Sequence, residues 1–431
     1  MSVDDQLRET VLSCIYTAKY LVSANAPPVE GGAFVVHGSQ IVAVGSLIEM
    51  QQSHPGVDVV DFGDAIISPL LVNAHTHLEL TDYPDWNRRV TGDGEEPQIF
   101  IDWILHLIGI KRTLQEGDYR LSLQHGIEQS LAAGTGAVGD ILSQLDLRDL
   151  YAASPLNGFA FLETLGHQPQ MIAENSGRLH RVLDEKVCGA VAFGVAPHSP
   201  YTISADYLSR IFTWCRNNSC RCTTHLAESP AEVQFIEEAT GDLVEKLYPH
   251  VGWQEYLPQP SGMRPVEYLD KQGGLFSGNL LVHGVQLADD EIRLLADKQM
   301  SLVLCPRSNA KLGVGKAPAG KLQHNGVKLA LGTDSLASCD SLSIWDEMAF
   351  ASHWFDGELD APTLYRMATL SGAEVLGLAE DIGSLEIGKK ANFQVLRPET
   401  MPDQGEIFDY FVSPGCTDDI VQVYHQGKLK V

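Results

Sequence analysis

The sequence has no apolar run that approaches the roughly 18 residues a membrane-spanning helix needs, so no membrane span is expected. The segment 1–22 contains acidic side chains and lacks the basic-then-apolar pattern of a secretory signal. Positive charge is also scarce, because 30 lysines and arginines stand against 56 acidic residues, which gives a formal net charge of −26. This balance argues against nucleic-acid binding, which needs basic patches to contact phosphates.

Paired cysteines are absent as well. The eight cysteines are scattered along the chain, and none forms a C-x-x-C motif. A chain of 431 residues does not need a disulfide scaffold to stabilise its fold, so a reducing cytoplasm is the predicted location. The length accommodates one large α/β barrel domain together with a smaller unit.

Apolar runs that end in polar residues indicate the fold class. Eight such runs begin with "AIISPLLVNAHTH" and end with "VKLALGTDS", and amphipathic helices such as 205–218 lie between most of them. Strands that alternate with helices in this way predict a parallel (β/α)₈ TIM barrel, an α/β fold, over residues 67–382. The segments 1–66 and 383–431 contain short strands and turns, and we expect them to form one small β-sandwich from both chain termini.

Two histidines follow the first apolar run. His75 and His77 are two residues apart, so on a strand they share one face at a Cα separation of roughly 7 Å. A lone H-x-H pair occurs often by chance. In a TIM barrel, however, the C-terminal ends of all strands meet at one mouth, where active sites lie. His225, His283 and Asp334 end later runs, so all five side chains are expected at that mouth.

Histidine nitrogens with one carboxylate suit zinc or iron. The fourth run ends in "GVAPHSPY", with no lysine that would bridge two metals. We therefore expect one divalent ion, zinc before iron, with an open position for water. Glu228 lies three residues after His225, where it could carry a proton from water to a leaving nitrogen. The alternative is that Glu228 only stabilises the beginning of a helix through the helix dipole.

Several motifs together resemble the amidohydrolase superfamily: "VNAHTHLEL", "APHSPYTIS", "HLAES", "LVHGV", "CPRSNAKLG", "LGTDSLAS" and the tail "GSLEIGKKANFQVL". The resemblance covers nearly the whole chain and implies a mononuclear member of the branch that deaminates nucleobases and nucleosides. It departs at Leu70, where relatives often carry glycine, a position outside the site. The roles that the resemblance implies are metal ligation by His75, His77, His225 and Asp334, contact with water or substrate by His283, proton transfer by Glu228 and Asp334, and substrate hydrogen bonding by His198.

Two features narrow the expected substrate. "HTHLEL" and Arg307 in "CPRSN" look like the aminodeoxyfutalosine deaminases of menaquinone biosynthesis, whose substrate is an adenine nucleoside with a carboxyphenyl ketone. Arg307 could pair with that carboxylate, although a surface or interdomain salt bridge is the alternative. Asp102 in "FIDWILHLIGIKR" could accept ribose hydroxyls or could simply be solvated. Glu163 and Asn309, at the ends of other runs, complete the predicted substrate contacts.

Other functions stay open at this point. An adenosine, methylthioadenosine or S-adenosylhomocysteine deaminase would use the same chemistry with a different pocket for the 5′ substituent. Another amidohydrolase could cleave an amide, an amidine or a carbon–halogen bond at the same site. A non-enzymatic scaffold is a third alternative, but such proteins usually lose metal ligands, and the full set is present here. The sequence leaves the oligomeric state open, and a homo-oligomer is compatible with it.

Overall fold

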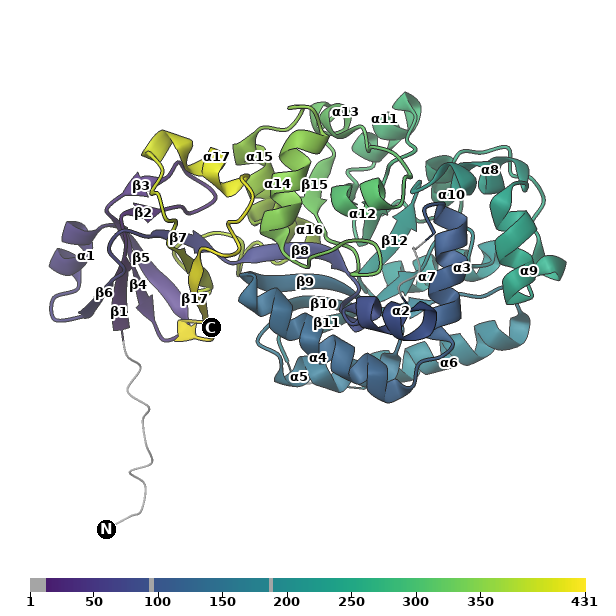
Figure 1. Ribbon diagram of the computed structural model, residues 1–431, viewed down its shortest axis with the longest axis horizontal. Coiled ribbons are helices and arrows are strands. Elements are labelled where there is room, and N and C mark those ends of the chain that lie inside the picture. Colours follow the sequence, from purple (N-terminus) through teal and green to yellow (C-terminus); the bar gives the residue numbers. More distant parts are fainter. Residues whose placement is uncertain (1–12, 93–96, 186–188) are drawn as a thin grey trace, which may run out of the picture.

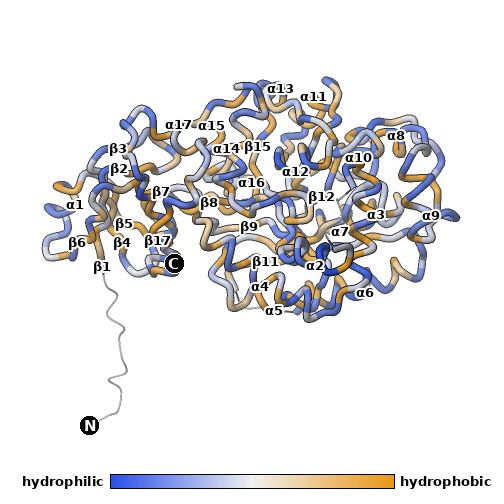
Figure 2. Tube along the Cα trace, viewed as in Figure 1, coloured by the Kyte–Doolittle hydropathy of each residue, from blue (hydrophilic) through white to orange (hydrophobic). Residues whose placement is uncertain are grey.

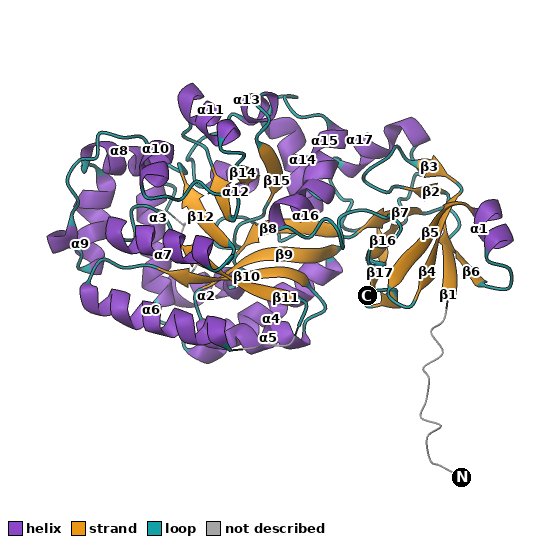
Figure 3. Cartoon of the chain, turned by 180° about the vertical axis from the view of Figure 1, so that it is seen from behind, coloured by secondary structure: helices purple, strands orange, loops and turns teal. Residues whose placement is uncertain are grey.

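A computed structural model describes residues 13–92, 97–185 and 189–431 of the chain. Figures 1 and 3 show a barrel of strands enclosed by helices, with a smaller β-structure beside it. The barrel sheet has the order β15-β14-β13-β12-β11-β10-β9-β8, all parallel, and a bridge between Thr76 and Asp334 joins its two ends. The predicted (β/α)₈ barrel is therefore confirmed. Its strands are β8 (Leu71–Thr76), β9 (Thr135–Leu142), β10 (Asn157–Thr164), β11 (Val191–Pro197), β12 (Cys222–Leu226), β13 (Asn279–His283), β14 (Ser301–Leu304) and β15 (Lys328–Leu331).

Helices cover the outside of the barrel (Figure 3). Along α4 to α6 the chain alternates between hydrophilic and hydrophobic residues, as expected of helices that bury one face (Figure 2). None of the helices in the described ranges has the length and hydropathy to cross a bilayer. The helices of this part are α2 (Tyr83–Thr91), α3 (Phe100–Lys111), α4 (Glu116–Ala132), α5 (Asp149–Ala153), α6 (Pro169–Asp184), α7 (Ala205–Asn217), α8 (Pro230–Glu238), α9 (Tyr248–Val251), α10 (Pro265–Lys271), α11 (Asp289–Asp297), α12 (Pro306–Lys311), α13 (Ala319–His324), α14 (Ile344–Trp354), α15 (Ala361–Met367) and α16 (Leu370–Leu376).

The smaller β-structure contains two sheets, with the orders β5-β4-β1-β6 and β18-β17-β16-β7-β2-β3. The second sheet combines strands from both ends of the chain, as the sequence predicted. Aromatic rings fill the space between the sheets, and Phe393 stacks on Tyr424 with their centroids 4.4 Å apart. The elements are β1 (Ser13–Thr17), β2 (Tyr20–Leu21), β3 (Val29–Glu30), β4 (Gly32–His37), β5 (Gln40–Ser46), α1 (Leu47–Ser53), β6 (Asp58–Asp61), β7 (Ile66–Pro69), β16 (Phe393–Leu396), α17 (Ile407–Phe411), β17 (Ile420–His425) and β18 (Lys428–Leu429).

One apolar run serves both parts of the molecule. The sequence pattern predicted a single barrel strand over residues 65–77, but the structure divides this run at Leu70. β7 pairs with β2 and β16 in the sandwich, whereas β8 pairs with β9 in the barrel. The sandwich strand thus extends to Pro69, beyond the expected boundary at residue 66. Both halves of the run are buried, so hydrophobicity alone gave no sign of the division.

The barrel interior is packed below the mouth. Alternate residues of the strands point inward, such as Phe159 and Phe161 of β10, and they join a buried apolar cluster with α16. This packing closes the lower end of the barrel. Polar side chains that continue the same inward rows beyond the apolar layer therefore reach the open C-terminal mouth, where the candidate site lies.

Candidate metal centre and substrate cavity

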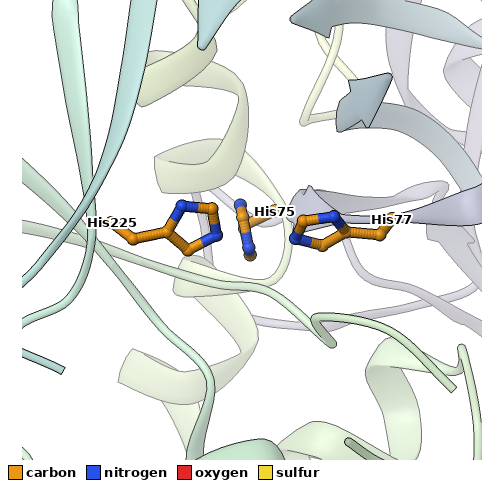
Figure 4. Close-up of side chains that lie close together, drawn as sticks. All are labelled: His75, His77 and His225. Carbon is orange, nitrogen blue, oxygen red and sulfur yellow. The ribbon is translucent and has the colours of Figure 1, made fainter. Parts of the chain in front are cut away.

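Three histidines from opposite sides of the barrel converge at its mouth. His75 is the penultimate residue of β8, His77 follows that strand, and His225 lies in β12. One ring nitrogen of each lies within 4.8 Å of the corresponding nitrogen of the other two. Figure 4 shows His75 between His77 and His225, with the three rings directed toward one another. The two-residue spacing in the sequence did bring His75 and His77 to one face, and the barrel brought His225 to meet them.

Asp334 supplies a carboxylate to the same group. Its Oδ1 lies 3.4 Å from His77 Nε2 and 3.8 Å from His75 Nε2. Its Oδ2 accepts hydrogen bonds from the hydroxyls of Ser308 and Ser338, at 2.7 Å and 2.9 Å. The two serines fix the carboxylate so that only Oδ1 faces the histidines. Neither serine was predicted as a site residue, although Ser308 lies in the motif "CPRSNAKLG" and Ser338 in "LGTDSLAS".

The protonation states of these histidines and their available ring nitrogens suit the binding of a cation. Burial, followed by the neighbouring histidines, lowers the pKa of His75 and of His77 well below the usual value, so both rings are neutral. Among the described residues His75 Nε2 has no hydrogen-bond partner despite being buried. His225 donates its Nδ1–H to the carbonyl oxygen of His198 at 2.7 Å, which leaves Nε2 available. Three neutral imidazoles and one carboxylate make a donor set that suits a divalent transition metal.

Burial would by itself raise the pKa of Asp334, but the adjacent His75 and His283 reverse this effect and lower it. The carboxylate is therefore ionised at neutral pH. Glu228 behaves in the opposite way, because burial and then the charge of Asp334 raise its pKa well above the usual value. Two carboxyl groups whose pKa values are driven apart at one site are suited to different roles, one as a fixed anion and one as a proton carrier.

His283 links Glu228 to the rest of the site. Its Nε2 lies 3.6 Å from Glu228 Oε1, and its Nδ1–H donates to Asn309 Oδ1 at 3.0 Å. This second bond fixes the ring orientation and leaves Nε2 directed at Glu228. Burial is the main reason why the pKa of His283 is lowered, so the ring is neutral. Asn309, predicted to contact substrate, instead lies behind His283 and holds it.

Three residues of the mouth have left-handed backbone conformations. Ala227 has φ 53°, His283 has φ 75° and Asp334 has φ 61°. Non-glycine residues rarely adopt this region, and each such residue costs on the order of 1–3 kcal/mol. The backbone turns sharply at these three points. These turns bring the side chains of Glu228, His283 and Asp334 close together at the mouth of the barrel. Nothing in the sequence signals these turns, since none of the three positions is glycine or asparagine.

A cavity of about 420 Å³ opens above the group. The volume is in the range of small-molecule sites. One face of α3 forms a wall, because Phe100, Trp103, Ile104, Leu107 and Ile108 recur at helical spacing. The opposite wall contains Leu165, Met171, Leu247, Val251 and Trp253. The cavity therefore combines polar reactive groups at its base with apolar and aromatic sides.

The predicted substrate contacts divide into two groups. Glu163 and His198 line the cavity. Arg307 and Asp102 are not among its lining residues, so the structure does not bring them to the proposed substrate.

Arg307 lies at the beginning of α12 and contacts Asp340, the Ser341 carbonyl oxygen and Glu347 instead. Its guanidinium is directed to the outer side of the helix, where acidic groups already bind it. Asp102 lies on the side of α3 that faces away from the cavity, and its carboxylate forms a 3.0 Å ion pair with Lys246. Both positions match the alternatives considered from the sequence more closely than the substrate-binding roles.

Known proteins are similar to this chain in sequence and in fold. A family model described as "Amidohydrolase family" matches residues 66–430. The aminodeoxyfutalosine deaminase of Deinococcus radiodurans is 30% identical, with 80% of this chain and 81% of that protein covered. The 5-methylthioadenosine/S-adenosylhomocysteine deaminase of Nitratidesulfovibrio vulgaris is also 30% identical, over 85% of this chain and 79% of the relative. A zinc-bound adenosine deaminase from Xanthomonas campestris superimposes with a TM-score of 0.79 and 25% identity, covering 97% of this chain and 93% of the other.

Proposed function

Since this chain belongs to the amidohydrolase family and is a hydrolase of the class that acts on carbon–nitrogen bonds, we propose that it deaminates an adenine nucleoside. The observation that carries the proposal is Glu228, a carboxyl group with a raised pKa, beside His283 and the three-histidine group at the base of a cavity. Two of the relatives that are 30% identical are named as deaminases of adenine-containing compounds, which supports this substrate class.

His75, His77, His225 and Asp334 would hold one divalent ion. We propose zinc, because the structurally similar adenosine deaminase contains it, and iron is the alternative. Such an ion supplies an activated water at neutral pH. The two serine hydroxyls on Asp334 Oδ2 keep the other carboxylate oxygen and the imidazoles in a fixed arrangement, which lowers the cost of ordering the site during the reaction.

Glu228 transfers the proton in the proposed reaction. Its Oε1 accepts a proton from the attacking water and delivers it to the purine ring or to the departing amino group. Water adds at the carbon that carries the amino group, and its two protons pass to the ring nitrogen and to the amino group, so that a carbonyl forms, the carbon–nitrogen bond breaks and ammonia leaves. Neutral His283 donates its Nδ1–H to Asn309, so its unprotonated Nε2 is positioned to accept a hydrogen bond from the attacking water. The raised pKa of Glu228 makes its carboxylate the stronger base toward the attacking water, and the neutral acid that results then donates the proton to nitrogen.

The best-supported substrate is aminodeoxyfutalosine, which would place the protein in menaquinone biosynthesis. Its carboxyphenyl ketone is a flat substituent that suits the aromatic and aliphatic walls of the cavity. Methylthioadenosine is the second candidate, because its small apolar substituent also suits these walls and a relative of equal identity is named for it.

An ammonia-release assay tests both the deaminase activity and the choice of substrate. The purified enzyme is offered aminodeoxyfutalosine, methylthioadenosine, S-adenosylhomocysteine and adenosine, with the Glu228→Gln variant as a blank for contaminating activity. We expect turnover of at least one compound and the highest kcat/KM for aminodeoxyfutalosine. A higher kcat/KM for methylthioadenosine would replace the first candidate by the second. No ammonia from any of the four would refute the deaminase proposal.

A further inference from the structure

A second cavity lies at the lower end of the barrel, away from the metal centre, and its volume is about 510 Å³. Part of its lining comes from the beginnings of three barrel strands. Arg221 directly precedes β12, Ser301 is the first residue of β14, and Lys328 is the first residue of β15. Parallel strands all begin at the end of the barrel opposite the mouth. Accordingly, none of the described residues lines both this cavity and the substrate cavity.

Positive charge is concentrated around this lower cavity. Arg221, Lys298 and Lys328 line it, and Glu374 is the one acidic side chain among its described lining residues. The Glu374 carboxylate already has a cationic partner, because its Oε1 lies 2.7 Å from Arg366 Nη2. This excess of cations contrasts with the chain as a whole, in which 56 acidic residues outnumber 30 basic ones. The lower cavity is therefore a place where the protein attracts negatively charged ligands.

Arg221 has no carboxylate partner in the described part of the chain. Its Nη2 donates a hydrogen bond to the carbonyl oxygen of Val375, near the end of α16, and its Cζ lies 5.5 Å from the centroid of the Phe159 ring. Its Nε is buried, and the described residues offer it no hydrogen-bond acceptor. Burial lowers the pKa of Arg221, with no opposing effect from a nearby acid among these residues. A largely buried cation that lacks a counter-ion costs stability, and a bound anion would remove that cost.

A purely structural role accounts for only part of this arrangement. The carbonyl groups at the end of α16 attract a cation through the helix dipole. Gly377 leaves room for the guanidinium there, since a Cβ at this position would lie 2.6 Å from Arg221 Nη1. Capping of α16 explains the bond from Nη2, but it explains neither the unpaired Nε–H nor the two lysines. Lys298 forms a 3.0 Å ion pair with Asp270, whereas the exposed Lys328 has no ion pair within the described ranges.

The three cations suit a ligand with several anionic oxygens. Arginine and lysine are the usual protein partners of phosphate, and hydrogen bonds between charged groups are shorter and stronger than neutral ones. A phosphate group can share its oxygens among several donors, whereas a carboxylate has only two. We propose that the lower cavity binds a phosphate group, with Arg221 as the central donor and Lys298 and Lys328 as flanking cations. The site takes free phosphate or the phosphate of a small metabolite, and it is separate from the proposed deaminase reaction.

Isothermal titration calorimetry tests the proposal. Inorganic phosphate, and in a second series glycerol phosphate, is titrated into the purified 431-residue protein at constant pH and ionic strength, with sodium chloride as the balancing salt. We expect saturable binding of one phosphate per chain. Binding of both compounds would show that the site accepts phosphate monoesters, and binding of inorganic phosphate alone would identify the free ion as the ligand.

Three variants locate the bound phosphate. Arg221→Met should raise the Kd for phosphate by about 10-fold or more, because it removes a charge-assisted donor. The double variant Lys298→Met/Lys328→Met should raise it by about 5-fold or more, since two flanking charges are lost. The matched control is Lys321→Met, which removes a lysine that pairs with Asp289 outside the lower cavity and should leave the Kd unchanged.

Phosphate could also bind at the metal centre, so the titration is repeated with His225→Ala, which is expected to lose its metal ion. Binding that persists in His225→Ala and weakens in the lower-cavity variants would support the proposal. Binding that disappears in His225→Ala and is unchanged in the lower-cavity variants would overturn it, as would the absence of saturable binding to the wild-type protein. If Arg221→Met does not fold because α16 loses its cap, the double lysine variant decides, since an unchanged Kd there would also overturn the proposal.

Discussion

Replacement of Glu228 by glutamine separates proton transfer from every other role of this position. The side chain is 9% exposed, and its Oε1 lies 3.6 Å from His283 Nε2. Glutamine has the same shape but cannot carry a proton at neutral pH. The surrounding loop is held by backbone N–H groups of Ala227 and Glu228, which donate to the Glu232 carboxylate. The substitution leaves these bonds in place, so the fold and the three-histidine group should persist.

The size of the effect follows from the groups that remain. General acid–base catalysis contributes about 10²–10⁴ in rate, which corresponds to about 3–5.5 kcal/mol of barrier. Asp334 is a poor replacement, because neighbouring histidines and a hydrogen bond from Ser308 lower its pKa and make it a weak base. Neutral His283 is the one nearby group that could accept a proton in part, which places the expected loss in kcat at about 10² or more. KM should change little, because the shape of the cavity is kept.

The assay combines initial rates of ammonia release with the metal-to-protein ratio from elemental analysis. The matched control is Glu238→Gln, on the exposed side of α8, which should retain wild-type kcat. Near-normal turnover of the Glu228→Gln variant would remove Glu228 from the mechanism. A loss of rate accompanied by a loss of metal would show that the residue holds the ion instead of the proton.

Three further predictions test the metal centre, Arg307 and the junction between the two parts of the molecule. His225→Ala should lose both bound metal and turnover, since it removes one of the three convergent nitrogens; a full equivalent of metal in the purified variant would contradict this assignment. Arg307→Met should lower the free energy of unfolding by about 1–3 kcal/mol, because it removes a buried partner of Glu347, and should affect carboxylated and uncarboxylated nucleosides equally; a loss confined to aminodeoxyfutalosine would restore the substrate-binding role. Burial, followed by the charges of Lys430 and Lys390, lowers the pKa of His425 to about 4, from an ordinary value near 6.5. Between these two pH values His425 binds a proton in the unfolded chain but not in the folded protein. The free energy of unfolding therefore falls as the pH drops below about 6.5. Between pH 7 and pH 5 the contribution is up to about 2 kcal/mol, and urea unfolding of His425→Gln should show a correspondingly flatter pH dependence than wild type.

The sequence predicted the barrel and the meeting of its metal-centre residues because both depend on strand geometry. Side chains at strand ends of a parallel barrel share one mouth, and histidine and aspartate are short enough to stay where the backbone places them. The same reasoning could not resolve the division of residues 65–77 between two sheets, since β7 and β8 are equally buried. It also could not find Ser308 and Ser338, whose function appears only when Asp334 lies between them.

Long side chains on helices required a different kind of reasoning. Arg307 lies shortly after a barrel strand, but its long side chain pairs with Asp340 and Glu347 instead of lining the cavity. The local sequence of α12 contains neither acid, so the nearest strand end was a misleading guide to the direction of the guanidinium.

The orientation of α3, by contrast, could have been predicted. Successive helical residues are turned by roughly 100°, so a helix that places Trp103, Leu107 and Lys111 on one side directs Asp102 away from it. The apolar row therefore decides which charge of the segment enters the cavity, and it selects the lysine. Asp102 then pairs with Lys246 outside, while Lys111 faces Glu163 inside.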